Sequence, residues 1–160
     1  MIILSIHKTT DYINFKEKIN PDWICHLVMY GNCSDYGNSD VSPVNPYLCD
    51  CHTHGLEKYG GKELQLVVKL PQNMIGYLLN VVGAMVRAGA ELKDGDYIDR
   101  LLEGCSVLIV KNEDSSGKEI LRIVVPDAKG RFPKDEGCEQ PYSLQGLSTH
   151  IIANGFKGYN

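Results

Sequence analysis

The segment from Leu64 to Gly89, LQLVVKLPQNMIGYLLNVVGAMVRAG, is the most informative part of the sequence about the fold. Its first part, residues 64–70, is apolar and rich in valine and leucine, which predicts a strand. Proline is favoured where a helix begins and glycine just beyond its end, so Pro71 and Gly89 bracket a helix. Apolar side chains recur between them at intervals of three and four residues, which predicts one long amphipathic helix over about 71–89.

Two glycines, Gly76 and Gly83, lie inside this predicted helix. Each costs the helix about 1 kcal/mol relative to alanine. We interpret their presence as a sign that another backbone approaches the helix closely.

Outside this stretch, shorter apolar runs predict the remaining elements. Strands are predicted at 2–6, 23–30 (as a buried strand), 47–53, 106–111 and 120–125, and helices at 11–19 and 97–103. The polar residues 112–118 predict a hairpin between the last two strands. Two long irregular stretches, 31–46 and 126–141, exceed the usual length of connections and are typical of functional or mobile loops.

The strands mostly follow one another directly along the chain. We therefore predict an α+β fold with a mainly antiparallel sheet, the long helix packed on one face, and shorter helices elsewhere. The 160 residues fit a single domain spanning 1–160, with its core at about 2–146. The tail, 147–160, has little periodicity, and we expect it to be mobile.

Composition narrows the classes of function. Hydrophobic residues make up 43% and charged residues 22%, both ordinary for a globular protein. The net charge of −4 argues against nucleic acid as a partner, since binding it depends on basic side chains. No apolar run reaches the roughly 20 residues that span a bilayer, and no signal peptide is recognisable. We expect no membrane association, a place in the cytoplasm of a bacterial or phage-infected cell, and six cysteines that remain thiols.

The densest cluster of chemically active side chains is CDCHTH, residues 49–54. Alternate residues of a strand share a face, so Asp50, His52 and His54 are predicted to point one way and the cysteines the other. Two histidines and a carboxylate on one face can hold zinc or another divalent metal. The alternative is an ordinary polar face. A Cys51 thiolate activated by His52 is disfavoured, because strand neighbours face opposite sides.

A second candidate site is the stretch PDAKGRFPK, residues 126–134, which gathers cations in an acidic chain. Arg131 and Lys134 supply charge, and Arg131 offers a planar fork suited to phosphate or carboxylate. Phe132 and Tyr142 add aromatic surface for stacking. This composition favours an anionic or nucleotide-like ligand, the alternative being a turn with solvated lysines.

No phosphate-binding loop, dinucleotide-binding fingerprint or nucleophile elbow is present in the sequence.

In the order and spacing of its short motifs, the chain resembles the bacterial and phage family called domain of unknown function 4262. The motifs that carry the resemblance are Thr53–Leu56, Glu63–Val68, Leu70-Pro71, Leu78–Asn80, Asp94-Gly95, Leu101–Gly104, Pro126-Asp127, Gly130–Pro133 and Gln145. The chain departs from the family in an enlarged 31–46 segment and in His52, where the family usually has tyrosine. The resemblance implies a small α+β domain without an assigned reaction, from a phage or mobile element.

The first functional hypothesis is a non-catalytic protein without a cofactor. It captures a small anionic or nucleotide-like ligand, or a partner protein, and acts as a sequestering counter-defence protein of a phage or mobile element. A homo-oligomer is expected, since such proteins often build pockets between subunits. Its ligand-binding residues are Arg131, Phe132, Lys134, Tyr142, His52 and His54. The hypothesis requires that the two groups of residues border one hollow, within a subunit or across two.

Two alternatives remain open. One is a metal-dependent hydrolase that uses Asp50, His52 and His54, with zinc or another divalent ion as its cofactor. The other is an immunity-type inhibitor, whose acidic surface would cover a basic toxin.

Overall fold

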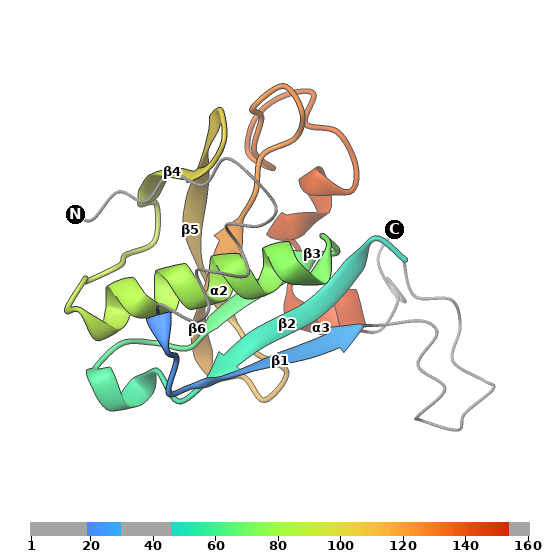
Figure 1. Cartoon of the computed structure of the whole chain (residues 1–160). Helices are drawn as coiled ribbons and strands as arrows, with labels where there is room; N and C mark the ends of the chain where they lie inside the picture. The colour runs from blue at the N-terminus through green and yellow to red at the C-terminus, as the bar shows by residue number, and fades with distance from the viewer. Residues whose placement is uncertain (1–18, 30–45, 154–160) are drawn as a thin grey trace.

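The computed structural model describes residues 19–29 and 46–153, and Figure 1 shows their arrangement. The predicted strand at 2–6 and nearly all of the predicted helix at 11–19 lie outside the described residues. So do almost the whole 31–46 segment and residues 154–160. In the described ranges, no helix has both the length and the apolar character needed to cross a membrane.

Six strands form one sheet, in the order β1-β2-β3-β6-β5-β4. Their bounds are β1 Ile24–Met29, β2 Leu48–His54, β3 Leu64–Val68, β4 Tyr97–Leu102, β5 Cys105–Glu113 and β6 Glu119–Val124. All neighbouring pairs are antiparallel except β3 and β6, which are parallel. The α+β class is therefore confirmed, and the sheet is mixed but mainly antiparallel.

The long helix, α2, spans Gln72–Arg87 and crosses one face of the sheet (Figure 1). Pro71 is its N-cap, so the helix begins one residue later than predicted. Gly89 has a positive φ of 99° beyond the helix end, as its place in the sequence predicted. The apolar stripe of α2 packs into the main core with side chains from most of the strands.

The prediction of a backbone close to both helix glycines is wrong. A Cβ on Gly83 would lie 2.8 Å from Cζ2 of Trp23, so the neighbour is an indole ring. Trp23 is buried and donates its Nε1–H to Oδ1 of Asn80, one turn earlier in α2, at 2.9 Å. A Cβ on Gly76 would meet nothing within 4 Å. Only Gly83 therefore has a packing reason to be glycine.

The opposite face of the sheet is covered at one end by the C-terminal residues. The 3₁₀ helix η3, Tyr142–Gly146, and the short helix α3, Thr149–Ala153, pack there. The buried Ile152 of α3 contacts Leu48 and Val67 of the sheet. Part of the predicted tail is thus folded onto the sheet.

The predicted helix at 97–103 is wrong, because these residues form strand β4. Glycine ends helices, but it also serves tight hairpin turns through its positive φ. Gly104, at φ 74°, lies in the turn that joins β4 to β5, where Leu102 pairs with Cys105. Arg100 also has a positive φ of 65°, which no helical residue adopts.

Strand β1 is not the buried strand that the apolar sequence of residues 23–30 predicted. β1 is at the edge of the sheet, with Ile24 63% and Leu27 39% exposed. The hairpin predicted at 112–118 is confirmed, since β5 and β6 pair from Glu113 and Glu119 onward. Asp114 orders its turn by accepting the backbone N–H groups of Ser116 and Lys118 at 2.9 and 3.0 Å.

Candidate metal centre

Three histidines from two neighbouring strands meet on one face of the sheet. The antiparallel register places His26 of β1 directly opposite His52 of β2. His54 lies two residues further along β2 and therefore on the same face as His52. One ring nitrogen from each imidazole lies within 4.8 Å of the others. His26 and His54 are exposed and His52 is partly buried, so ions in solution can reach the cluster.

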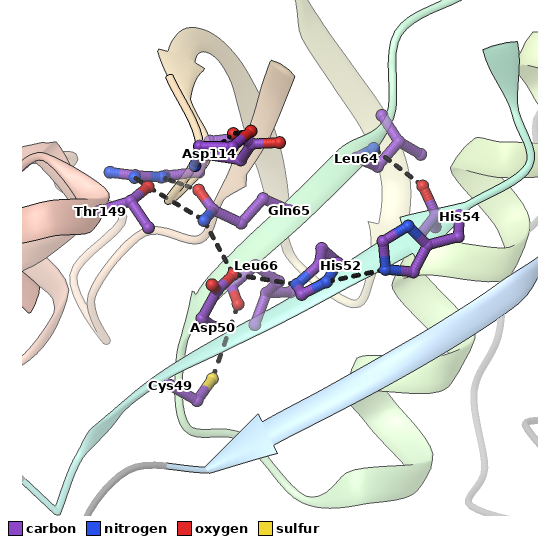
Figure 2. Close-up of polar contacts among 12 residues, drawn as sticks. Cys49, Asp50, His52, His54, Leu64, Gln65, Leu66, Asp114 and Thr149 are labelled. Atoms are coloured by element: carbon purple, nitrogen blue, oxygen red, sulfur yellow. Dashed lines mark hydrogen bonds and ion pairs between the residues drawn. The ribbon is translucent and has the colours of Figure 1, made fainter. Parts of the chain in front are cut away.

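The spacing of the imidazoles suits a shared metal ion. Nε2 of His52 and Nε2 of His54 are 3.1 Å apart (Figure 2). Two nitrogens bound to one zinc at about 2.0–2.1 Å with tetrahedral angles lie about 3.3 Å apart. The ring of His26 is centred 5.1 Å from that of His54 and 5.6 Å from that of His52. His26 is exposed on the edge strand, so its side chain has room to rotate towards the other two imidazoles.

Asp50 contacts Nδ1 of His52, whereas the other ring nitrogen, Nε2, faces His54. Its Oδ1 accepts a hydrogen bond from Nδ1 of His52 at 3.1 Å. Burial raises the pKa of Asp50, but hydrogen bonds from His52 and Gln65 outweigh it and hold that pKa below its ordinary value. The same hydrogen bond to Asp50 raises the pKa of His52 against the opposing effect of burial. A carboxylate in this place orients a metal-binding imidazole and increases its basicity.

Asp50, His52 and His54 share a face, as strand alternation predicts. The ring nitrogens that converge belong to His26, His52 and His54, while Asp50 is hydrogen-bonded to Nδ1 of His52. Sequence reasoning missed His26 as a member of the cluster because nothing in its spacing from His52 points to a pair. The sequence did hold one signal, since His26 lies in an apolar run that precedes the strand with His52 and His54. An antiparallel pairing of these two strands brings His26 opposite His52.

A cavity of about 500 Å³ adjoins the histidines at the end of β2. Its lining comes from β2, the start of β3, the 3₁₀ helix η2 (Glu57–Tyr59) and the β5–β6 turn. The lining residues are Asp50, His52, Thr53, His54, Gly55, Glu57, Glu63, Gln65, Asp114, Ser115, Ser116, Lys118 and Ile120. An ion pair between Lys118 and Glu57 joins two of these walls. The volume suits a small molecule.

The part of the cavity wall that follows β2 is ordered by the carboxylate of Glu63. Glu63 accepts hydrogen bonds from the hydroxyl of Thr53 at 2.9 Å and from the backbone N–H groups of Gly55 and Leu56 at 3.1 and 3.0 Å. These contacts fix the turn that follows His54. The cavity wall is therefore ordered by internal contacts.

The residues of the predicted anion site have partners within the protein. Arg131 donates from Nε to Oδ2 of Asp127 at 2.9 Å, and its Nη2 lies 3.4 Å from Oε1 of Glu139. Burial raises the pKa of Asp127, yet backbone N–H groups and Arg131 together hold it well below its ordinary value. Lys134 donates to the hydroxyl of Tyr97 at 2.5 Å.

The predicted stacking aromatics of that site are largely packed away. Phe132 is only 7% exposed and packs with Leu108 and Val124. Its ring also makes a T-shaped contact with that of Tyr97, at 5.6 Å between centroids. Tyr142 is partly buried against the main core. The face of Phe132 is thus not available to a ligand in this arrangement.

Topology separates the two halves of the predicted binding site. β2 runs antiparallel to β3, and β3 runs parallel to β6. The end of β2, with His52 and His54, therefore lies beside the start of β6, whereas the 126–141 stretch leaves from the end of β6 (Figure 1). Within one chain the histidines and Arg131 lie at opposite ends of the sheet.

The cysteines lie away from the histidines. Cys49 and Cys51 are fully buried on the α2 side of the sheet, as the strand alternation predicted. The hydrogen bond to the Cys51 thiol and burial raise the pKa of Cys49. Along the described part of the chain, the cysteines Cys25, Cys49, Cys51, Cys105 and Cys138 are all unbridged.

Comparison of the chain with protein-family models, with curated proteins and with solved structures finds no match. The resemblance to domain of unknown function 4262 therefore stays a prediction, and the case for function depends on the geometry of the site.

Proposed function

We propose that this protein is a metal-dependent hydrolase whose ion is bound by His26, His52 and His54. The observation that carries the proposal is the convergence of the three imidazoles within 4.8 Å beside a cavity. Asp50 supports the proposal because its carboxylate bonds Nδ1 of His52 and so orients the ring with Nε2 towards the cluster.

The ligand type favours zinc among the available ions. Neutral imidazoles suit zinc, and three protein ligands leave a fourth tetrahedral position for water, as in catalytic zinc sites. A zinc ion held by these three histidines would lower the pKa of a bound water to about 7 and would so supply hydroxide near neutral pH. The cavity beside His52 and His54 would hold the substrate next to that water.

The first experiment measures metal binding. The untagged protein is stripped with a chelator and titrated with zinc by calorimetry, and we expect about one equivalent to bind. His52→Ala and His54→Ala should each weaken binding at least about tenfold. His150→Ala is the matched control, because His150 is an exposed histidine of α3 outside the cluster, and its loss should leave the affinity unchanged. Equal affinity in all four proteins would overturn the metal site.

The second experiment measures catalysis. The zinc-loaded protein is assayed with activated carboxylic and phosphoric esters, and we expect turnover that disappears in His54→Ala and persists in His150→Ala. A protein that binds one zinc and hydrolyses neither ester class would keep the metal site but lose the hydrolase.

Sequestration of an anionic ligand and inhibition of a toxin stay predictions. Their support is the composition of the 126–134 stretch and the net charge of −4. The partners of Arg131 and Lys134 within the protein favour the histidine cluster as the functional site instead.

A further inference from the structure

A buried arginine lies in line with the histidines across four strands. The pairing register places His26 opposite His52, His52 opposite Gln65, and Gln65 opposite Arg122. Gln65 and Arg122 are both fully buried. The cost of burying a guanidinium is met by hydrogen bonds, including those from Nη1 to the backbone carbonyls of Gln145 and Leu147 at 2.7 and 2.5 Å.

The arginine determines which way the glutamine amide faces. A guanidinium only donates, so the atom of Gln65 that lies 2.8 Å from Nε of Arg122 must be the carbonyl Oε1. The amide nitrogen then faces Asp50, and it donates to Oδ1 of that carboxylate at 2.9 Å (Figure 2). A flipped amide would set donor against donor at Arg122 and acceptor against acceptor at Asp50.

Thr149 closes the network and confirms this direction. Its hydroxyl accepts from Gln65 Nε2 and from Arg122 Nη2, both at 3.1 Å. It donates its one proton to the backbone carbonyl of Glu113 at 2.6 Å. A hydroxyl has one proton and two lone pairs, so every position on it is used. The glutamine amide is thus held in one orientation by two independent partners.

The Gln65 amide holds the Asp50 carboxylate in place next to His52, since Oδ1 of Asp50 contacts both residues. An ionised Asp50 only accepts, so Nδ1 of His52 must carry the proton in the hydrogen bond between them. In the neutral ring, Nε2 is then the nitrogen with the lone pair, and Nε2 is the atom that faces His54 at 3.1 Å. An imidazole left to itself in water prefers the opposite tautomer.

We infer that Gln65 and Arg122 are positioning residues that fix the tautomer of His52, so that its metal-binding nitrogen presents a lone pair to the cavity whenever the ring is neutral. The consequence for metal affinity depends on the function proposed above. The tautomer itself does not, because the hydrogen bonds impose it before any ion binds.

The test is the nitrogen-15 NMR spectrum of the histidines in metal-free protein, which shows which ring nitrogen carries the proton. It is recorded at a pH high enough that the His52 signals no longer change with pH, so that the ring is neutral although its pKa is raised. The spectrum of His52→Ala identifies the signals of His52. We expect the proton of wild-type His52 on Nδ1, and a proton on Nε2 would overturn the inference.

Variants test the role of the glutamine. Gln65→Leu should shift the population of His52 towards the Nε2–H tautomer and weaken zinc binding about tenfold. Gln65→Asn, whose amide is too short to reach both Arg122 and Asp50, should do the same with less disturbance of the core. Tyr77→Phe is the control for loss of a buried hydrogen bond, because the buried Tyr77 donates its hydroxyl to the backbone carbonyl of Leu101 on β4, at the other edge of the sheet from β1. An unchanged tautomer in both Gln65 variants would refute the positioning role.

The outcomes separate this inference from the proposed function. An Nδ1–H tautomer in a protein that binds no zinc would keep the network and overturn the metal site. Zinc binding by a protein whose His52 carries its proton on Nε2 would keep the metal site and overturn the inference about the tautomer.

Discussion

Alanine at the two glycines of α2 should change the stability of the protein in opposite directions. Gly76→Ala should raise the free energy of unfolding by about 1 kcal/mol, because alanine is the better helix former. Its new methyl group would meet nothing within 4 Å. This substitution therefore measures the helix propensity term alone.

Gly83→Ala gains the same propensity but must also move an indole ring. The new Cβ would lie 2.8 and 2.9 Å from two ring carbons of Trp23, closer than real contacts allow. Overpacking of a core costs about 1–3 kcal/mol. Displacement of the ring also strains its buried hydrogen bond to Asn80, which is worth about 1 kcal/mol. After the propensity gain, we expect a net loss of about 1–3 kcal/mol.

The assay is urea unfolding followed by circular dichroism and by fluorescence of Trp23, the single tryptophan of the chain. Trp23 directly precedes β1, so Gly83→Ala should also displace that strand and weaken zinc binding through His26, whereas Gly76→Ala should not. Equal stabilisation by both substitutions would refute the close packing of Trp23 on α2.

Three further predictions concern single carboxylates and one aromatic ring. Asp50→Asn should lower zinc affinity about 10–100-fold in a calorimetric titration, because the amide no longer anchors the Nδ1 proton of His52 as a carboxylate does; unaltered affinity would contradict an orienting role. The folded-state pKa of Asp127 lies below its unfolded value of about 3.9, so its contribution to stability is complete above that value and is lost as the pH falls further. Urea midpoints measured down to about pH 2 should therefore fall less steeply for Asp127→Asn than for the wild type, and parallel curves would argue against it. Phe132→Ala should destabilise the protein by about 3 kcal/mol in the same assay, since the ring is buried, and a loss below about 1 kcal/mol would place it on the surface.

Local patterns were enough where one element determines its own structure. The helix at Gln72–Arg87 was predictable because a period of three to four apolar residues arises within one helix. The shared face of Asp50, His52 and His54 was predictable for the same reason, since strand backbone geometry alone alternates the side chains. Gly104 misled because a positive φ serves helix ends and hairpin turns alike, and only pairing with β5 distinguishes them.

The class of fold, the long helix, the β5–β6 hairpin and two of the three clustered histidines could thus be predicted from the residues alone. The pairing of β1 with β2, which brings His26 to His52, and the parallel pairing of β3 with β6 could be seen only in the folded chain. The same topology placed Arg131 at the far end of the sheet from the histidines. The physical reason is that strand pairing joins residues distant along the chain and depends on the packing of the whole core, whereas periodicity is written into each segment.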